Sequence, residues 1–405
     1  MKRREFLKST AMVTAATAAT TATTMVSPVE AATHRAKVRS YNRLGSTDIK
    51  MSDISYGAGR LPSASMVLRA IQRGINYFDT APDYGPSEDH IGEALKRHGQ
   101  RDKIVIASKY CHPISYQSGK SHLQVGSGVD EYISAVENSL KRMGTDYLDI
   151  VFVHAIGEKP DYEHERDRLL DPDMLEATER LKEAGKIKYL AVSSHGPHNM
   201  ETLMLDAVRS GKFDVIMPAF NFMKFPRVPD VLKEAHQRGV GVVAMKTLAG
   251  AKDGGISGEG TFEHAAFKWV LQHQEVAGLV ISIKTVRDLD LYLAASGERF
   301  TASDQRVLDH YAARFGNEYC RTGCGDCESS CPEGVSIASI LRYQMYFQDY
   351  GDEKHAMRSY AALDRKGQAE VCLSCQSAVC SGSCEHGLPL AAKLQAAHRD
   401  LSFSV

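Results

Sequence analysis

Short apolar runs rich in β-branched residues alternate with longer stretches of helical periodicity between residue 41 and about residue 296. This alternation is typical of βα units that build a parallel sheet. The predicted strands cover residues 53–57, 76–80, 104–109, 148–154, 189–193, 215–221, 240–246 and 278–284. Eight strands at this spacing predict an α/β fold in which residues 41–300 close into a (β/α)8 barrel.

The ends of the intervening helices support this interpretation. A basic residue followed by glycine, as in Arg73-Gly74, suits both the negative end of a helix dipole and a left-handed C-terminal cap. The alternative is an open, doubly wound sheet, which requires a glycine-rich phosphate loop after the first strand. Residues 57–60 read Gly-Ala-Gly-Arg, a poor match to GxGxxG, so the barrel is favoured.

A second, smaller domain is predicted over residues 301–405. Helices are expected at residues 303–315, 337–350 and 353–363. The second of these carries an apolar and aromatic surface, which we expect to pack the tail on itself or on the barrel, with a partner-docking face as the alternative. The residues of this surface are Leu341, Tyr343, Met345, Tyr346 and Phe347.

Composition narrows the function classes. The 405 residues include 49 Lys plus Arg and 50 Asp plus Glu, and 43% of them are hydrophobic. Such a chain can bury a large core, which excludes a disordered or collagen-like protein. A net charge of -1 gives no electrostatic reason to expect nucleic acid or an anionic membrane as a partner.

The N-terminus resembles a bacterial twin-arginine signal peptide. Arg3 and Arg4 stand in a basic segment, and an uncharged run of mostly Ala and Thr follows up to Val29. The run is too weakly apolar for a good membrane span, and small residues precede a predicted cleavage before Ala32. Residues 1–31 are therefore expected to be removed on export to the periplasm, leaving no transmembrane segment.

Four ionisable residues stand at or just beyond the ends of predicted strands: Asp79, Tyr84, Lys109 and His154. The C-terminal ends of barrel strands converge on the active site. A lysine ammonium beside a tyrosine stabilises the phenolate, and an aspartate keeps that lysine charged and in place. Such a tyrosine can protonate a carbonyl oxygen as hydride reaches the carbon, while a histidine orients the same oxygen. A cap, a strand end or a core histidine would explain any one of them, but not all four together.

Residues 78–88, 107–109 and 152–154 resemble the signature segments of the aldo-keto reductases, and the similarity extends from residue 43 to about residue 296. The resemblance implies a (β/α)8 barrel that binds NADP(H) in an extended form at the strand C-termini, and that interconverts a carbonyl and an alcohol. It also implies that the catalytic tetrad of the family corresponds to Asp79, Tyr84, Lys109 and His154.

The cofactor positions of that family are matched in part. A Ser-Ser pair stands where the family has Ser-Asn, and Met217 replaces a usual glutamine. A lysine at the end of the seventh strand is placed for the pyrophosphate, and two basic residues after the eighth favour the 2'-phosphate of NADP over NAD. The predicted cofactor-binding residues are Ser193, Ser194, Asn221, Lys246, Lys284 and Arg287.

The nine cysteines are distributed unevenly. Cys111 stands alone and is expected to be a buried, inert thiol rather than a redox-active one. The other eight form two sets that resemble a two-cluster ferredoxin, in which three thiolates of one set and the last of the other hold each [4Fe-4S] cluster. This resemblance implies the ligand sets Cys320, Cys324, Cys327 and Cys384, and Cys372, Cys375, Cys380 and Cys331.

Two alternatives remain for the tail: four disulfides, or zinc bound by the paired CxxC units. The CxxCxxxCP core favours clusters. The predicted signal peptide also favours clusters, because twin-arginine export moves a folded protein whose cofactors are already inserted. A cluster accepts one electron and a hydride carries two, and no flavin motif is visible, so the clusters are expected to serve in electron relay or in stability.

The leading hypothesis is thus an exported NADP(H)-dependent oxidoreductase that acts on a small carbonyl or alcohol, with a redox protein as a possible partner. One alternative is a protein without catalysis that senses a nicotinamide or docks a redox partner. Another makes a bound alcohol such as a sugar the electron donor for the tail.

Overall fold

The computed structural model describes residues 35–114, 120–159, 161–196, 198–223, 227–248, 261–321 and 324–402. The predicted signal peptide lies outside these residues. Ala36–Val405 form one compact unit, which includes both the barrel and the tail. No helix in the described ranges is long and apolar enough to span a membrane.

Eight parallel strands close into a barrel, because the last strand pairs with the first of the ring, Leu279 aligning with Ile54. This closure confirms the predicted barrel and excludes the open sheet. Each strand of this ring falls on a predicted one, with ends that differ by at most three residues. The ring consists of β3 (Ile54–Gly57), β4 (Tyr77–Asp79), β5 (Val105–Lys109), β6 (Leu148–Val153), β7 (Ile187–Ser194), β8 (Val215–Pro218), β9 (Gly241–Ala244) and β10 (Gly278–Ile281).

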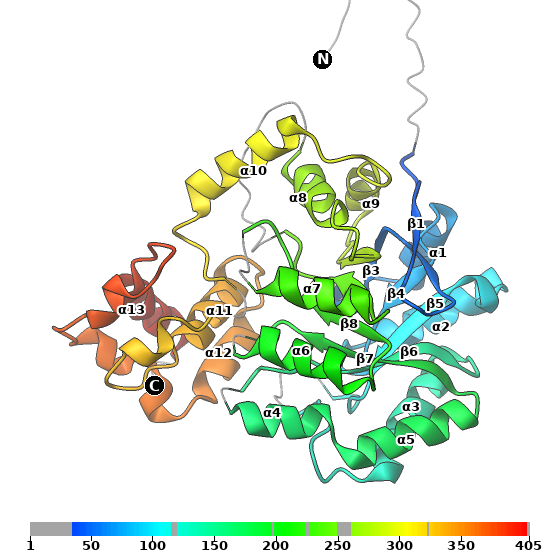
Figure 1. Ribbon diagram of the computed structural model, residues 1–405, viewed down its shortest axis with the longest axis horizontal. Coiled ribbons are helices and arrows are strands. Elements are labelled where there is room, and N and C mark those ends of the chain that lie inside the picture. Colours follow the sequence, from blue (N-terminus) through cyan, green and yellow to red (C-terminus); the bar gives the residue numbers. More distant parts are fainter. Residues whose placement is uncertain are drawn as a thin grey trace, which may run out of the picture. The chain divides into compact units, whose positions relative to one another are not determined.

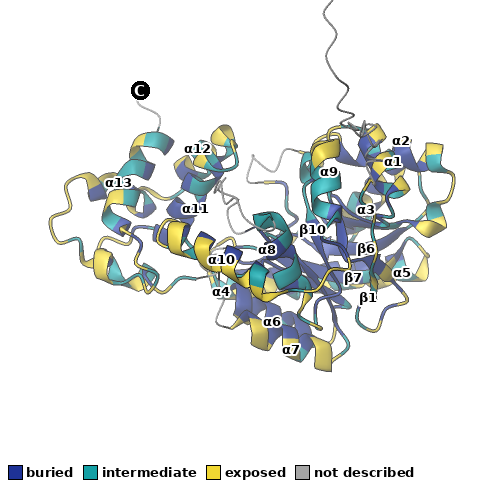
Figure 2. Ribbon diagram, turned by 90° about the horizontal axis from the view of Figure 1, so that it is seen from above, coloured by how far each residue is buried: buried dark blue, intermediate teal, exposed yellow. Residues whose placement is uncertain are grey.

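Helices surround the strands, and their inner faces form the main hydrophobic core with the outer faces of the strands. Figure 2 shows the strands buried and the outer helix faces exposed. As predicted, glycines with positive φ follow the helices, including Gly74 (93°) and Gly144 (60°). The helices of the barrel are α1 (Ala64–Gln72), α2 (Ser87–His98), α3 (Val129–Met143), α4 (Tyr162–Leu169), α5 (Pro172–Glu183), α6 (Met200–Ser210), α7 (Val228–Gln237), α8 (Phe262–Leu271) and α9 (Val286–Leu293).

A hairpin that the sequence pattern did not reveal, β1 (Tyr41–Arg43) and β2 (Lys50–Ser52), packs against the inside of the barrel. Its turn comes so close to β9 that a Cβ on Gly45 would lie 2.4 Å from the backbone nitrogen of Gly241. Three-residue strands are too short for a recognisable alternation of polar and apolar residues, so only the tertiary structure shows this element.

The tail contains α10 (Ala302–Phe315), α11 (Ile337–Gln348), α12 (Glu353–Ala361) and α13 (Leu390–Leu401), and the last of these was not predicted. Figure 1 shows α11, α12 and α13 gathered together, coloured orange to red. The helix α10 begins with a capping box of Thr301 and Asp304. It is held to α8 by stacking of Tyr311 on Phe262, with ring centroids 4.1 Å apart.

The helix α11 joins the tail to the strand ends of the barrel. Its Arg342 donates to Nδ1 of His195 over 3.2 Å, and its Ser339 hydroxyl lies 3.1 Å from Nε2 of His198. The Nζ atom of Lys246 lies 5.3 Å from the centre of the ring of Tyr346, which is also on α11. The expectation that the aromatic surface packs the tail on itself or on the barrel is therefore confirmed, since its residues belong to the hydrophobic core of the tail and Tyr346 also contacts Lys246.

His195 and His198, which contact helix α11 where the tail meets the barrel, are expected to make the stability of the fold sensitive to acid. Burial, and then the charge of Arg342, lowers the pKa of His198 to about 4, and burial lowers that of His195 well below its usual value. Between about pH 6.5 and pH 4 the unfolded chain therefore binds more protons than the folded one, so acidification lowers the free energy of unfolding. We expect His198→Gln to reduce this pH dependence by less than about 1.4 kcal/mol per pH unit, because His198 is partly exposed. Urea unfolding at pH 7 and pH 5 measures it, and equal pH slopes in both proteins would contradict the expectation.

Candidate active site

The ends of three consecutive strands bring the predicted tetrad together. Asp79 is the last residue of β4, Lys109 is the last of β5, and His154 directly follows β6. Tyr84 follows β4 in the loop before α2. Because β4, β5 and β6 are adjacent and parallel, these side chains emerge at the same end of the barrel.

The geometry matches the roles that the residue types suggest. Nζ of Lys109 lies 2.5 Å from Oδ1 of Asp79 and donates to the carbonyl oxygen of Thr80 over 2.9 Å. It also stands 5.2 Å from the centre of the Tyr84 ring. The hydroxyl of Tyr84 shares a hydrogen bond of 3.3 Å with Nε2 of His154. The four predicted catalytic residues thus form one connected group.

Burial sets the electrostatics of this group. Lys109 is 1% exposed and Asp79 is 5% exposed, so their charges stabilise each other in a site with little water. Burial raises the pKa of Asp79, while Lys109 opposes that rise. Burial also lowers the pKa of His154 well below its usual value, with His122 and Lys109 acting in the same direction. His154 is therefore a neutral imidazole at neutral pH.

Three of the predicted cofactor residues are buried among backbone groups at the next strand ends. Ser193 accepts a hydrogen bond from the backbone of Ala155, and Ser194 donates to the carbonyl oxygen of Ile156. Asn221 is fully buried and donates to the carbonyl oxygen of Lys246 over 2.9 Å. These contacts orient the side chains and leave further hydrogen-bonding capacity on each.

Lys246 occupies an unusual position. Its φ of 57° is in the left-handed region, which non-glycine residues adopt mainly where the surrounding structure imposes it. Burial lowers the pKa of its ammonium, and the charges of Arg342 and Arg60 oppose that ammonium further. These three cations create a positive potential at the end of β9 to which the tail contributes.

Lys284 and Arg287 are exposed at the start of α9, beyond the end of β10. The backbone of Lys284 donates to the carboxylate of Asp288, which also takes part in a capping box with Thr285. The two basic side chains thus stand at the same end of the barrel as the tetrad, open to solvent.

All nine cysteines of the chain lie within the described residues, and each thiol, including the eight in the tail, is free. Electrostatic interactions divide the eight tail thiols into two groups. Burial, and then the neighbouring acidic groups Cys320, Glu328, Cys324 and Cys384, together raise the pKa of Cys327 to about 12. Burial likewise raises the pKa of Cys372 to about 11, and its interacting thiols are Cys331, Cys380 and Cys375.

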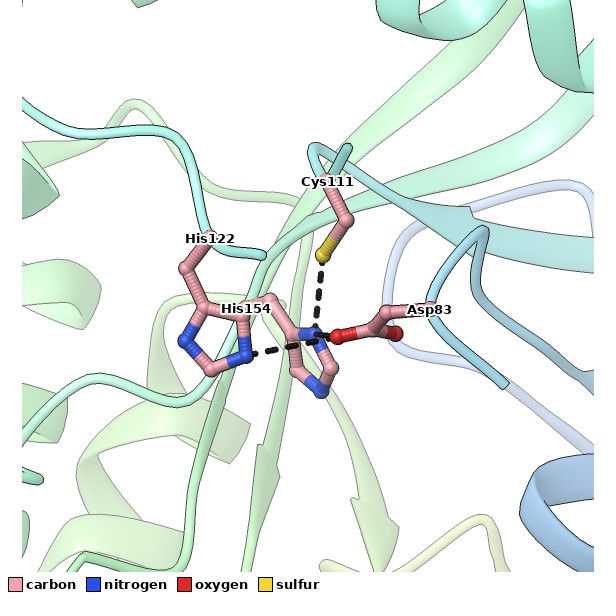
Figure 3. Close-up of side chains that lie close together, drawn as sticks. All are labelled: Asp83, Cys111, His122 and His154. Atoms are coloured by element: carbon pink, nitrogen blue, oxygen red, sulfur yellow. Dashed lines mark hydrogen bonds and ion pairs between the residues drawn. The ribbon is translucent and has the colours of Figure 1, made fainter. Parts of the chain in front are cut away.

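The structure also places residues beside the tetrad to which the sequence drew little attention. Cys111 is 1% exposed, as expected for a buried thiol, but its Sγ lies 3.0 Å from Nδ1 of His154. Asp83 and His122 complete this group (Figure 3). Arg168 supports it, because its guanidinium donates to the carbonyl oxygens of His154 and Leu123. Asp83 lies inside the signature segment next to Tyr84, which was the one available signal.

A search against family models matches residues 60–263 to the "Aldo/keto reductase family". The chain belongs to the aldo/keto reductase family. The family assignment agrees with the eight-stranded barrel and with the tetrad geometry, which were established from this chain alone.

Individual relatives of known name share 26–30% of their aligned residues with this chain. The chain is 28% identical over 237 residues to aldo-keto reductase YhdN of Bacillus subtilis, matching 55% of this chain and 66% of that one. It is 30% identical to L-galactose dehydrogenase of Arabidopsis thaliana, with 51% and 64% covered. It is 26% identical to L-glyceraldehyde 3-phosphate reductase of Escherichia coli, with 52% and 61% covered. The chain thus spans slightly less than two thirds of the length of these relatives.

Solved structures support the fold. A putative aldo-keto reductase from Pseudomonas aeruginosa is 25% identical, with a TM-score of 0.53 over 65% of this chain and 96% of the other. An aldo-keto reductase from Bacillus halodurans is 22% identical, with a TM-score of 0.52 over 68% of this chain and 96% of the other, and shows the fold alone. About two thirds of this chain therefore covers almost the full length of each of these two structures.

Proposed function

We propose that the protein interconverts a small carbonyl compound and its alcohol by hydride transfer with NADP(H). The observation that carries this proposal is the connected tetrad, in which Lys109 contacts Asp79 and stands beside the ring of Tyr84, whose hydroxyl is bonded to His154. Two relatives are named for a sugar and a sugar phosphate, which supports a polyhydroxylated aldehyde or alcohol as the substrate class.

In the proposed reaction, side chains of the tetrad transfer the proton to and from the substrate oxygen. A substrate oxygen near Tyr84 and Nε2 of His154 accepts a hydrogen bond from each when Nε2 carries the imidazole proton. As the oxygen gains negative charge, Tyr84 transfers its proton to it and becomes a phenolate. The ammonium of Lys109 stabilises that phenolate, and Asp79 holds Lys109 in position. In the oxidative direction, the phenolate removes the proton from the alcohol.

The donor groups at the neighbouring strand ends fit a nicotinamide dinucleotide. Ser193, Ser194 and Asn221 offer hydroxyl and amide groups for the carboxamide, and the cations around Lys246 suit a pyrophosphate. Lys284 and Arg287 suit the 2'-phosphate that distinguishes NADP from NAD. The cofactor supplies the hydride.

We also propose that the tail holds two [4Fe-4S] clusters with the ligand sets named above. The mutual influence of Cys327 with Cys320 and Cys384, and of Cys372 with Cys331, supports these sets. Each set combines three cysteines of one sequence group with one of the other, so each cluster would bridge distant parts of the tail. The clusters would then contribute to the stability of the tail, electron relay to a redox partner being a further role.

Finally, we propose that the chain is exported to the periplasm by the twin-arginine machinery. The support is the Arg3-Arg4 pair with its uncharged run and cleavage site. Export in the folded state is compatible with clusters inserted beforehand.

One experiment tests these proposals together. The full chain is expressed in a bacterium, purified anaerobically from the periplasm and studied by native mass spectrometry, with iron and sulfide determined in parallel. We expect a chain that starts at Ala32, about eight iron and eight sulfide per chain for two cubane clusters, and bound or readily bound NADP(H). Absence of bound nicotinamide together with no turnover of added NADPH on any aldehyde would refute the catalytic proposal. Absence of iron would refute only the cluster proposal.

A further inference from the structure

Four potential metal ligands converge beside the tetrad, on the side of His154 that faces away from Tyr84. They are Asp83, Cys111, His122 and His154, and their ligand atoms all lie within 4.8 Å of one another (Figure 3). Three of them are buried, and His122 is partly buried. Asp83 follows β4, Cys111 follows β5 and His154 follows β6, while His122 is aligned with Cys111 by a backbone bridge.

The contacts in this group share atoms in a way that a chain of hydrogen bonds does not explain. Nδ1 of His154 lies 3.0 Å from Sγ of Cys111 and 3.6 Å from Oδ2 of Asp83. A catalytic thiol relay places the thiol on one ring nitrogen and the carboxylate on the other. Here both approach the same nitrogen, and Oδ2 of Asp83 also lies 3.6 Å from Nε2 of His122. The four ligand atoms thus lie close together, all within 4.8 Å of one another.

The carboxylate of Asp83 provides independent evidence. It is 2% exposed, and although Ser121 and Cys111 are its neighbouring hydrogen-bonding side chains, neither oxygen makes a well-formed hydrogen bond among the described residues. Burying an unpaired carboxylate is costly, and buried charges are normally paired or coordinate a metal. One oxygen of Asp83, Oδ2, points toward both His154 and His122 (Figure 3), so the cost is removed if a cation lies between them.

We propose that Asp83, Cys111, His122 and Nδ1 of His154 bind a divalent metal ion, zinc by preference. A thiolate and a carboxylate balance the two positive charges of the ion, and the imidazoles bind as neutral ligands. The set of one sulfur, two nitrogens and one oxygen is typical of zinc. Bonds of about 2.0–2.3 Å in a tetrahedron place the ligand atoms roughly 3.3–3.6 Å apart. Oδ2 of Asp83 lies 3.6 Å from a nitrogen of each histidine, close to this spacing, while Sγ of Cys111 and Nδ1 of His154, now 3.0 Å apart, would separate slightly as the ion binds.

The surroundings supply what a metal site needs beyond its ligands. Nδ1 of His122, the nitrogen that faces away from the group, lies 3.6 Å from the carboxylate of Glu158, as in the carboxylate–histidine pairs that orient metal-bound imidazoles. A cavity of about 270 Å³, lined in part by His112, His122 and Glu158, borders the site and gives an ion a route of entry. Binding releases the proton of the Cys111 thiol as the metal–sulfur bond forms.

The site also determines the state of a catalytic residue, a consequence that rests on the proposed function. With Nδ1 of His154 bound to the ion, the single imidazole proton is on Nε2, which faces the hydroxyl of Tyr84. Nε2 is then a permanent donor to the substrate oxygen. The ion would hold His154 in the tautomer that carbonyl reduction requires, without itself contacting the substrate.

Metal content tests the proposal, independently of turnover. The full chain is purified anaerobically, and zinc is quantified separately from iron by mass spectrometry. We expect about one zinc per chain in the unmodified protein, and a loss of about tenfold or more in Cys111→Ser and in His122→Gln. Cys375→Ser, which removes a proposed cluster ligand from the tail, serves to locate the zinc: an ion bound beside the tetrad is retained in this variant.

A spectroscopic measurement identifies the ligand. Cobalt(II) is added to protein produced without zinc, and a thiolate-to-cobalt charge-transfer band is expected in the unmodified chain and in Cys375→Ser but not in Cys111→Ser. Circular dichroism establishes that each variant is folded. No zinc and no cobalt band in the unmodified protein would overturn the proposal. So would zinc that persists in Cys111→Ser and disappears in Cys375→Ser, because the metal would then be in the tail. Neither result would affect the proposal of carbonyl reduction.

Discussion

Tyr84→Phe is expected to lower kcat/KM for carbonyl reduction by about 10²- to 10⁴-fold. The substitution removes one hydroxyl, the group that protonates the substrate oxygen in the proposed mechanism, and keeps the ring beside Lys109. Binding of NADPH, measured by fluorescence, should change little, because the ring remains in place. The expected loss is therefore in kcat, which steady-state kinetics with an aldehyde substrate measures.

Tyr77→Phe is the matched control. Tyr77 begins the same strand that ends at Asp79, and its buried hydroxyl has no hydrogen-bond partner in the described part of the chain. Removing an unsatisfied buried hydroxyl is expected to leave activity unchanged and to stabilise the fold by up to about 1 kcal/mol. Equal activity in Tyr84→Phe and Tyr77→Phe would show that Tyr84 is not the acid.

Lys109→Met is expected to have the largest effect on stability. The side chain lies 1% exposed inside the barrel end and contacts the carboxylate of Asp79 over 2.5 Å. Removing its charge leaves a buried carboxylate without its counter-ion, which typically costs about 3–5 kcal/mol. Urea unfolding measures this loss, and carbonyl reduction should be lost as well because the phenolate of Tyr84 is no longer stabilised.

Adding Asp79→Asn to Lys109→Met separates the two effects. The neutral amide removes the unpaired charge, so the double variant should recover part of the stability but none of the activity. Lys103→Met is the control for the loss of a lysine charge, since Lys103 pairs with Asp102 at the surface and should change the free energy of unfolding by less than about 1 kcal/mol. A double variant no more stable than Lys109→Met would mean that the destabilisation comes from lost packing or from the bond to Thr80 rather than from the charge.

The strands and the tetrad could be predicted because their signals are local. Each barrel strand is a short apolar run between turn residues, and a residue at the end of such a run has its position in a parallel barrel determined. Asp79, Lys109 and His154 could thus be assigned to one end of the barrel before their contacts were known. The hairpin of β1 and β2 and the helix α13 could not be assigned, because the hairpin strands are too short for a periodic pattern and α13 follows an irregular cysteine-rich segment.

The group of Asp83, Cys111, His122 and His154, in contrast, could not be predicted from local signals in the sequence. Its four members are separated by as many as 71 positions, and no spacing between them forms a metal-binding motif. Their convergence depends on the path of the loops after β4, β5 and β6, and on the bridge between Cys111 and His122. Loop paths depend on many weak tertiary contacts, such as those of Arg168 with the backbone of His154 and Leu123, and no local pattern encodes them.

The sequence alone therefore determined the class of fold, the end of the barrel at which chemistry occurs, and the four residues of the tetrad, since each depends on periodicity or on position at a strand end. The tertiary structure decided what surrounds them. It placed α11 against Lys246 and His195, and it directed the carboxylate of Asp83, the thiol of Cys111 and the imidazole of His122 toward the back of His154. The physical reason is that backbone periodicity acts over a few residues, whereas contacts between loops and between barrel and tail form only when the whole chain has packed.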